Sequence, residues 1–212
     1  MLDHLLYAGP DLGEAVALIA ELTGVSAVPG GRHLDLGTAN YLIGLGPGAY
    51  LEIIGPDPQA ADPPQAGWLG LAGLPAARLL TWAVRSGDID AAVSSARAAG
   101  YDPGSATPMS RRTEDGTVLH WRLTPDTVAS SGGTVSFLID WGSTAHPSTR
   151  ALPDLTLTAL TASHPDPERH AAVRAGYGAR CPARVGRAHR CRGRATRRGR
   201  RELSRSQMSR LS

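Results

Sequence analysis

The feature that most constrains the fold is a pattern that occurs twice within residues 1–145. A short apolar run opens the chain and is followed by Asp11-Leu-Gly-Glu-Ala-Val16. A second apolar run, Leu79–Val84, is followed by Asp88-Ile-Asp-Ala-Ala-Val93, 77 positions after the first such segment. A short apolar run bounded by turn residues is typical of a buried strand, and an acidic residue before a helical pattern is typical of an N-cap. The repetition therefore predicts an internal duplication of one supersecondary unit.

The first predicted helix begins after Asp11, which has Glu14 three residues later, the spacing of a capping box. Its apolar side chains recur at helical spacing: Leu12, Ala15, Val16, Ile19 and Leu22. Thr23-Gly24 ends the pattern, because glycine readily takes the left-handed conformation that closes a helix. The segment thus predicts a helix of about three turns. The second predicted helix opens at Asp88 and closes at Gly100.

Three strand candidates follow each predicted helix. In the first unit they lie around residues 32–36, at 41–45 and at 49–54. In the second unit they lie at 105–110, 118–123 and 134–141. Turn residues at Gly46-Pro-Gly48 and Glu114-Asp-Gly116 predict a hairpin in each unit. We therefore predict an α+β fold of two tandem βαβββ modules, 1–58 and 78–145, joined by a loop rich in Pro, Gly and Ala.

Beyond residue 150 the pattern is incomplete. Leu155–Leu160 alternates apolar and polar residues, as a half-exposed strand does. His164-Pro-Asp-Pro-Glu168 resembles the start of a helix, with proline in its first turn. We therefore predict a partial third βα unit at 151–173, followed by an arginine-rich tail at 174–212.

The tail differs from the rest of the chain in charge. Residues 174–212 contain 13 Arg and one Glu, a net charge of +12, whereas residues 1–173 contain 9 Arg and 18 acidic residues, a net charge of −9. Three hypotheses remain open: a disordered arm that binds nucleic-acid phosphates, a solvated extension, or an ending read out of frame from GC-rich codons. The interrupted third unit and the late Cys181 and Cys191 favour the last, and nucleic-acid binding is the least favoured.

Composition and motifs exclude several classes of protein. No apolar run reaches the ~18 residues of a membrane span, and the N-terminus lacks a basic segment before an apolar stretch, so we expect a cytoplasmic protein without a membrane partner. The two cysteines lack the paired spacing of a zinc site. Gly44-Leu-Gly46 lies in a predicted hairpin rather than in a strand-to-helix turn, so it does not predict a phosphate-binding loop.

Two residues carry the chemistry that the sequence offers. His4 is the lone imidazole in the first apolar run, and Glu52 is the lone carboxylate in the apolar run at 49–54. A carboxylate within an apolar run is costly to bury unless it is paired, protonated or bound to metal. If both side chains share a pocket, they predict a metal or acid–base site. The alternatives are a histidine that binds a backbone group and a glutamate that faces solvent.

A second set of candidates concerns substrate binding. His120 and Arg122 alternate with apolar neighbours, so they share one face of a strand. If that face is concave, Arg122 would bind a carboxylate or phosphate group; the alternative is the solvated side of a sheet. Arg32 and His33, beside Gly30-Gly31, are weaker candidates of the same kind.

Six segments together resemble glyoxalase-like proteins of the vicinal oxygen chelate superfamily: Leu2-Asp-His-Leu-Leu-Tyr-Ala8, Gly30-Gly-Arg-His33, Ala49-Tyr-Leu-Glu-Ile-Ile54, Met109-Ser-Arg111, His120-Trp-Arg-Leu123 and Phe137-Leu-Ile-Asp-Trp-Gly142. The resemblance covers roughly residues 1–170. It implies paired βαβββ modules whose curved mixed sheets enclose a cleft. In members with a metal, the ligands come from the first and last strands of each module.

Position by position, His4 matches the first-strand ligand of module one and Glu52 its last-strand ligand. Module two departs from the pattern, because Thr81 stands 77 positions after His4 and is a poor ligand. Its last strand offers Asp140, provided that Asp140 has the strand parity of the position equivalent to Glu52. A divalent metal held by His4, Glu52 and Asp140 is therefore a hypothesis, with Fe, Mn, Ni or Zn as suitable ions.

These observations lead to three hypotheses of function. The first is a glyoxalase-like, metal-dependent lyase, isomerase or dioxygenase-type enzyme that acts on a small oxygenated substrate, in which Glu52 binds the metal or serves as the catalytic base. The second is a non-catalytic module that sequesters a small ligand, which Thr81 favours. The third is nucleic-acid binding through the tail. The expected partners are a small molecule and, as an open option, a second copy of the chain in a homodimer.

Overall fold

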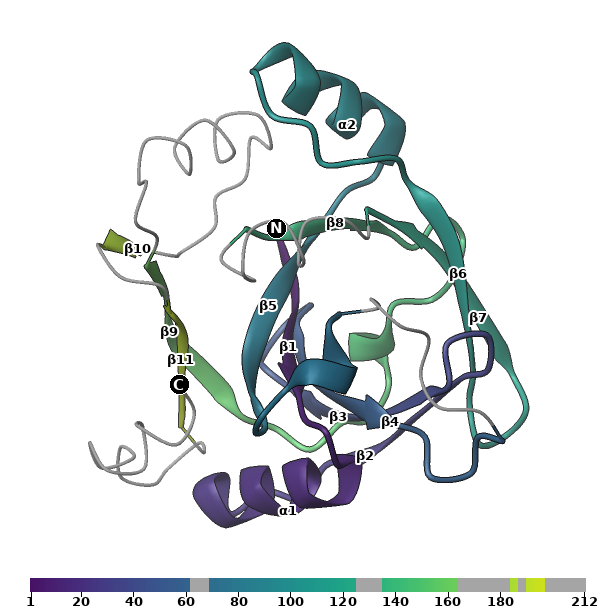
Figure 1. Ribbon diagram of the computed structural model, residues 1–212, viewed down its shortest axis with the longest axis vertical. Helices are drawn as coiled ribbons and strands as arrows, with labels where there is room; N and C mark the ends of the chain where they lie inside the picture. The colour runs from purple at the N-terminus through teal and green to yellow at the C-terminus, as the bar shows by residue number, and fades with distance from the viewer. Residues whose placement is uncertain (62–68, 125–134, 164–183, 187–189, 197–212) are drawn as a thin grey trace.

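Two βαβββ modules build one closed eight-stranded sheet (Figure 1). The computed structural model describes residues 1–61, 69–124, 135–163, 184–186 and 190–196. Module one comprises β1 (Leu2–Ala8), α1 (Leu12–Thr23), β2 (Val28–His33), β3 (Thr38–Gly44) and β4 (Tyr50–Pro56). Module two comprises β5 (Arg78–Arg85), α2 (Ile89–Ala98), β6 (Thr107–Arg112), β7 (Val118–Leu123) and β8 (Phe137–Asp140).

The strand order around the sheet is β1-β4-β3-β2-β6-β7-β8-β5. Each module therefore contributes four neighbouring strands, and the modules join where β1 pairs with β5 and β2 with β6. The β1–β4 and β5–β8 pairs are parallel, and the other pairs are antiparallel. The predicted α+β class, with tandem modules and a curved mixed sheet, is confirmed.

The pairing of β1 with β5 tests the proposed duplication. His4 lies opposite Ala83, and Leu6 lies opposite Thr81. With the 77-residue offset seen in the sequence, His4 is equivalent to Thr81 and Leu6 to Ala83. The two pairs are thus exchanged by the symmetry that relates the modules. The sequence offset is therefore also the structural offset for these strands.

Both helices begin as the sequence predicts. The Asp11 carboxylate accepts a hydrogen bond from the backbone N–H of Glu14 at 2.8 Å, and Asp88 accepts one from Ala91 at 3.0 Å. Each bond satisfies an N–H group that has no partner within the first turn of the helix. Helix α1 ends at Gly24, whose φ of 68° is left-handed. Both helices lie outside the closed sheet, at opposite ends of the view in Figure 1.

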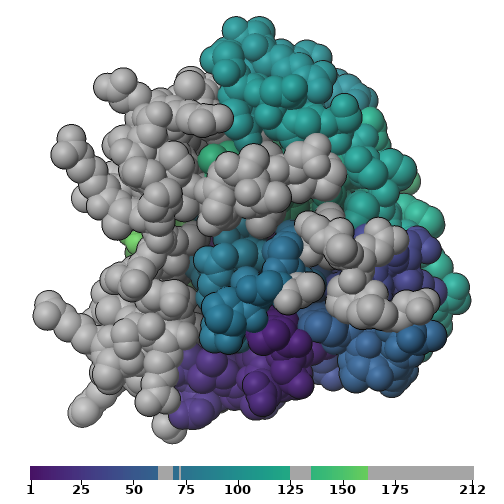
Figure 2. Space-filling model, viewed as in Figure 1, coloured from purple at the N-terminus to yellow at the C-terminus, as the bar shows by residue number. Residues whose placement is uncertain are grey.

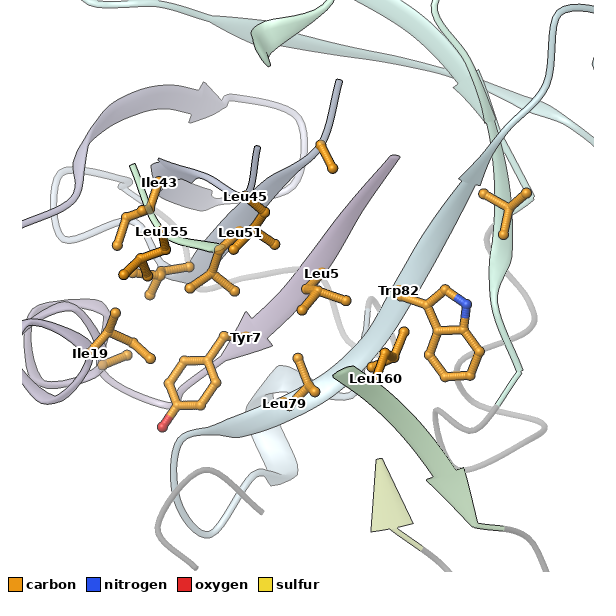
Figure 3. Packing of buried hydrophobic residues seen from close by; sticks show 14 of the residues in the cluster. Leu5, Tyr7, Ile19, Ile43, Leu45, Leu51, Leu79, Trp82, Leu155 and Leu160 are labelled. Carbon is orange, nitrogen blue, oxygen red and sulfur yellow. The ribbon is translucent and has the colours of Figure 1, made fainter. Parts of the chain in front are cut away.

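Apolar side chains pack on both faces of the sheet because residues alternate along each strand. On the outer face, Leu5 and Tyr7 of β1 and Leu51 of β4 join one cluster with Ile19 of α1 (Figure 3). A second cluster fills the inner face and includes Leu6, Tyr50 and Ile54 among others. Figure 2 shows the purple and blue atoms of module one and the teal atoms of module two as adjoining parts of the surface.

The segments after residue 145 add to the outer face. The predicted strand at Leu155–Leu160 overlaps β9 (Thr156–Ser163), and both Leu160 and Leu155 belong to the outer cluster. Short 3₁₀ turns occur at Leu71–Gly73 and Pro147–Thr149. Within the predicted tail, β10 (Arg184–Gly186) and β11 (Arg190–Thr196) pair with β9 in a three-stranded sheet. The predicted helix at His164 lies outside the described residues.

Two local predictions differ from the structure. The strand expected around residues 32–36 is β2, which ends at His33, and a turn with Gly37 at φ 64° then leads into β3. Gly30-Gly31 therefore lies within a strand rather than before one.

In the part of the chain that the structure describes, no helix has the length and apolar character needed to cross a membrane.

Candidate functional site

The inner face of the closed sheet surrounds a cavity that opens to solvent; its empty space, which includes open solvent at the mouth, is about 510 Å³. Its walls are largely apolar and aromatic, with Tyr50, Trp121, Phe137 and Trp141 among them. Besides Tyr50, four residues with ionisable or charged side chains line it: His4, His33, Glu52 and Arg111. An apolar cavity with a few converging polar groups is the usual form of a small-molecule site.

The cavity brings together the two residues that the sequence singled out. Strands β1 and β4 run parallel, and His4 and Glu52 both point to their inner face. His4 Nε2 lies 3.3 Å from Glu52 Oε2, and both side chains are buried. The prediction that these two side chains share a pocket is thus confirmed for the geometry, whereas their chemical roles stay predictions.

Asp3 holds the other edge of the His4 ring. Neighbouring side chains on a regular strand point to opposite faces, but the β1–β5 register shifts between Leu2 and His4. Such an irregularity can re-aim a side chain. Here the Asp3 carboxylate reaches the adjacent ring, with Oδ1 2.7 Å from His4 Nδ1.

Asp3 is fully buried and has three further partners. Its Oδ2 accepts hydrogen bonds from Arg85 Nε at 2.8 Å and Trp141 Nε1 at 3.1 Å, and it lies 3.0 Å from His146 Nε2. Burial alone would raise the pKa of Asp3, but the hydrogen bonds from His146 and His4 outweigh it. The pKa of Asp3 is therefore held well below its ordinary value, and the side chain is a carboxylate at neutral pH.

The ionised Asp3 determines how His4 meets Glu52. Because a carboxylate can only accept hydrogen bonds, His4 Nδ1 must carry a hydrogen. The contact between Nε2 and Glu52 Oε2 is then attractive only if one proton lies on one of these two atoms. The pair of His4 and Glu52 can therefore hold a proton at a fixed place in the cavity wall.

Asn40 of β3 orients the other oxygen of Glu52. The Asn40 amide donates from Nδ2 to Glu52 Oε1, and Asn40 lies opposite Ile54 across the β3–β4 pair. Within the described ranges, Asn40 Oδ1 has no hydrogen-bond partner although it is buried. Glu52 is thus held on both sides, with Asn40 at Oε1 and His4 at Oε2.

Two aromatic or imidazole groups complete the module-one wall. Tyr50 stacks on His4 with ring centroids 4.8 Å apart. Burial and the nearby carboxylates of Asp3 and Glu52 raise the pKa of Tyr50 well above its ordinary value, so the phenol stays neutral. His33 is also buried, with Nδ1 3.1 Å from Thr38 Oγ1, and burial lowers its pKa to about 4. His33 is therefore a neutral group in the cavity at pH 7.

Three predicted substrate-binding residues lie away from the cavity. Arg122 is exposed and binds the Asp90 carboxylate of α2 through both terminal nitrogens, at 2.7 Å and 2.9 Å. His120 is exposed on the same strand. Arg32 binds Asp57. The face that carries His120 and Arg122 is thus the solvated face of β7, because Trp121 and Leu123 take the cavity side. Of this predicted set, His33 alone lines the cavity.

Asp140 is not brought to His4 and Glu52, because the predicted register of β8 is wrong. The β5–β8 pairing places Phe137 opposite Ala83, as β1–β4 places Glu52 opposite Leu6. Phe137 is therefore the equivalent of Glu52, and Asp140 has the opposite parity. Asp140 instead accepts hydrogen bonds from the backbone N–H groups of Ile89 at 3.2 Å and Gly142 at 2.9 Å.

The residues at the cavity do not fit the predicted three-ligand metal site. Among the residues that the structure describes, no group of three or more His, Cys, Asp or Glu side chains is placed to hold a metal ion. His4 and Glu52 are two donors that already face each other, and the guanidinium of Arg111 adds positive charge to the same cavity. This donor set does not match the three protein ligands that catalytic zinc sites use.

Sequence reasoning missed three residues that shape the site: Asp3, Asn40 and Arg111. Asp3 offered a signal, since a second polar residue beside His4 in an apolar run needs a partner. Arg111 belongs to one of the segments that carry the resemblance, but its direction depends on the register of β6. Asn40 gave no pattern of its own, because one amide near the start of a strand is common.

Comparison with known proteins agrees with this architecture. A family described as "Glyoxalase-like domain" matches residues 2–177 of the chain. The chain belongs to this glyoxalase-like family. A search of curated proteins found no match.

Solved structures that align with the chain include a hypothetical protein and two epimerases. A hypothetical protein from Staphylococcus aureus aligns with a TM-score of 0.58 and 13% identity over 83% of this chain and 74% of its own. Methylmalonyl-CoA epimerase from Mycobacterium tuberculosis aligns with a TM-score of 0.41 and 17% identity over 70% of this chain and 91% of its own. The Streptomyces coelicolor methylmalonyl-CoA epimerase, in complex with 2-nitronate-propionyl-CoA, aligns with a TM-score of 0.43 and 18% identity over 69% of this chain and 98% of its own. At these identities, the first likeness shows the fold alone.

Proposed function

We propose that this glyoxalase-like chain is an enzyme of the isomerase or lyase class that moves a proton on a carbon next to a carbonyl group of a small oxygenated substrate. One observation carries the proposal: Glu52 and His4 lie 3.3 Å apart, buried in the wall of an apolar cavity. A carboxylate in such a setting is typical of a general base, because water does not compete for it.

The proposed step begins with Glu52 ionised and the shared proton on His4. Glu52 Oε2 removes a proton from the substrate carbon, and the electron pair of the broken C–H bond moves toward the carbonyl oxygen to form an enolate. Where the reacting carbon also carries a hydroxyl group, the intermediate is an enediolate. Glu52 returns the proton to the former carbonyl carbon, and the hydroxyl proton moves to the other oxygen, which gives an isomer. In the lyase reaction, the enolate instead expels a leaving group from the next carbon, and the leaving group takes the proton from Glu52. No part of this step runs through a metal.

The neighbours of Glu52 have distinct parts in this scheme. Asn40 at Oε1 and His4 at Oε2 fix the orientation of the carboxylate, and the second lone pair of Oε2 accepts the substrate proton. His4 is a positioning residue, because its ring is fixed between Asp3 and Glu52. Asp3 keeps the hydrogen on Nδ1 and so keeps Nε2 directed at Glu52. The largely apolar, aromatic wall lowers the polarity around these side chains, which strengthens their interactions.

The test follows hydrogen exchange in deuterium oxide. Wild-type protein is incubated with dihydroxyacetone, acetoin or pyruvate, and loss of the proton next to the carbonyl is followed by NMR. We expect exchange above the solvent rate with at least one compound, and a loss of about 100-fold or more in Glu52→Gln. Glu21→Gln, at an exposed glutamate of α1, is the matched control and should exchange like wild type. Exchange that is absent with all three compounds, or unchanged in Glu52→Gln, contradicts the proposal.

A second candidate is a protein that binds a small ligand in this cavity without catalysis. Thr81 and Phe137 favour it, because they stand where module two would otherwise repeat His4 and Glu52. The same experiment separates the two candidates. A sequestering protein would shift the ligand resonances on binding but would leave the rate of hydrogen exchange at the solvent value.

A further inference from the structure

Arg111 is a buried cation that the proposed reaction does not use. It lies on β6, next to the seam where Arg112 pairs with Arg32 of β2, and its side chain lines the cavity. It is only 2% exposed. Burial of an unpaired charge is among the most costly arrangements in a protein interior, so a buried arginine without a partner is expected to bind a ligand.

The guanidinium of Arg111 has free donors. Among the described residues, its Nε and Nη2 atoms are buried and have no hydrogen-bond partner. Four other arginines in the described part of the chain are each paired with a carboxylate: Arg32, Arg85, Arg97 and Arg122. Those four side chains are more exposed than that of Arg111. The most deeply buried of the five arginines is therefore the one without a carboxylate partner.

The chain makes room for this side chain with two glycines. A Cβ on Gly31 would lie 2.8 Å from Arg111 Cγ and 2.4 Å from the backbone oxygen of Arg112. A Cβ on Gly30 would lie 3.0 Å from Arg111 Nη1 and 2.2 Å from Asn40 Oδ1. Gly30-Gly31 therefore lets the guanidinium approach Asn40, whose amide holds Glu52. The free cation and the proposed base thus share one wall of the cavity.

The two free nitrogens define what would bind there. Guanidinium N–H groups on Nε and on a terminal nitrogen form a planar fork that matches the two oxygens of a carboxylate. A ligand bound there should be small and carry a single negative charge. The walls of the cavity are largely apolar, and the carboxylate of Glu52 would repel a second negative charge. The neighbouring His33 adds no positive charge at pH 7, since burial lowers its pKa to about 4.

We propose that Arg111 is the anchor for a carboxylate group of the substrate, so that the cavity takes a small carboxylate that also carries a carbonyl group. The inference rests on the proposed function, because it names the substrate class of that reaction. The anchor fixes one end of the molecule, and the carbonyl-bearing carbon then lies toward Glu52. Binding at Arg111 can nevertheless be measured without turnover.

The first arm of the test compares ligands on the full-length protein. Pyruvate, its uncharged analogue pyruvamide and inorganic phosphate are titrated by NMR or calorimetry. We expect pyruvate to bind about 10-fold to 100-fold more tightly than pyruvamide, the range for a charge-assisted contact, and more tightly than phosphate. Equal affinity for pyruvate and pyruvamide, tighter binding of phosphate, or no binding of pyruvate at millimolar concentration overturns the inference.

The second arm compares variants. Arg111→Met should weaken pyruvate binding by the same factor and leave pyruvamide unaffected, whereas Arg122→Met, at an exposed arginine on the neighbouring strand, should bind like wild type. Arg111→Lys keeps the charge without the fork and should bind with intermediate affinity, which gives a second reading if Arg111→Met does not fold. Unchanged affinity in both Arg111 variants overturns the inference.

Glu52→Gln separates this inference from the proposed function. It should bind pyruvate at least as tightly as wild type, because a repelling charge is removed while the anchor stays. If pyruvate binding depends on Arg111 but no hydrogen exchange occurs, the anchor stands and the reaction fails. If exchange depends on Glu52 but affinity does not depend on Arg111, the reaction stands and the anchor fails.

Discussion

The two modules share one backbone plan but contribute different chemistry to the cavity. Module one supplies His4, His33 and Glu52, while the described lining residues of module two are apolar or aromatic apart from Thr124 and Arg111. Thr81 is the module-two equivalent of His4, and Phe137 is the equivalent of Glu52. The duplication has thus kept the strands and their register without repeating the polar pair.

This difference shows which properties each part of the sequence must satisfy. Strand pairing and alternation of apolar residues specify the closed sheet, and many side chains satisfy them on the inner face. Proton transfer or anion binding needs particular groups at particular positions. One module therefore suffices to place a base, while the other can provide the apolar wall and a single cation.

Substitutions at the equivalent positions 52 and 137 should give the largest difference between the two modules. Glu52→Gln should lower kcat/KM for hydrogen exchange by about 10²-fold to 10⁴-fold, because it removes the group that accepts the proton. Phe137→Leu should lower it by less than about 10-fold, because the ring packs edge-on against His4 and lines the wall but accepts no proton. NMR exchange rates at several substrate concentrations measure both. Similar losses in the two variants would show that the modules contribute alike.

The second prediction concerns Asp3, whose module-two counterpart at the 77-residue offset is the apolar Leu80. Asp3→Asn should lower the free energy of unfolding by about 3 kcal/mol, because it leaves Arg85 and the imidazoles of His4 and His146 without a buried carboxylate. Urea unfolding monitored by tryptophan fluorescence gives this value.

An exposed acidic residue provides the control for Asp3. Asp102→Asn removes an exposed ion pair with Arg97 and should change the free energy of unfolding very little. A small effect in both variants would mean that the network around Asp3 does not stabilise module one.

The third prediction uses pH to test whether the inner face of module one is dry. The folded pKa of His33 is about 4, below its ordinary 6.5, because burial disfavours the charged ring. The unfolded chain therefore binds the proton more tightly, so the contribution of His33 is complete above pH 6.5 and is lost as the pH falls from 6.5 toward 4. The loss should be on the order of 3 kcal/mol.

Unfolding free energies between pH 7 and pH 4 (roughly the window between the two pKa values) measure this slope. His33→Gln should flatten it, whereas His120→Gln, at an exposed histidine of module two, should leave it as in wild type. A slope that is the same in all three proteins would mean that His33 is hydrated.

Comparison of sequence and structure shows where pattern reasoning works. The helices were predictable because Asp11 and Asp88 are local caps, and their hydrogen bonds span three residues. The duplication was predictable because a fixed offset survives in the sequence. His4 and Glu52 were predictable as a pair because a polar group in an apolar run is costly.

The rest depended on long-range register, which local patterns do not specify. Asp140 was placed on the wrong face because a shift of one residue reverses the direction of every side chain in a strand. Arg111 could not be assigned because its neighbours Gly30 and Asn40 come from strands of the other module. The interaction of Asp3 with His4 requires the irregular register of β1, which no sequence pattern marks.

The smallest predicted effect tests the placement of Asp140 on the outer face. Asp140→Ala should lower the free energy of unfolding by about 1 kcal/mol, because its carboxylate accepts from the first backbone N–H of α2. Asp88→Ala, which removes the N-cap of the same helix, should give a similar loss. Pyruvate affinity and bound metal, measured by elemental analysis, should equal those of wild type in both variants, because neither carboxylate lines the cavity. A fall in bound metal in Asp140→Ala alone would show instead that Asp140 reaches the pair of His4 and Glu52.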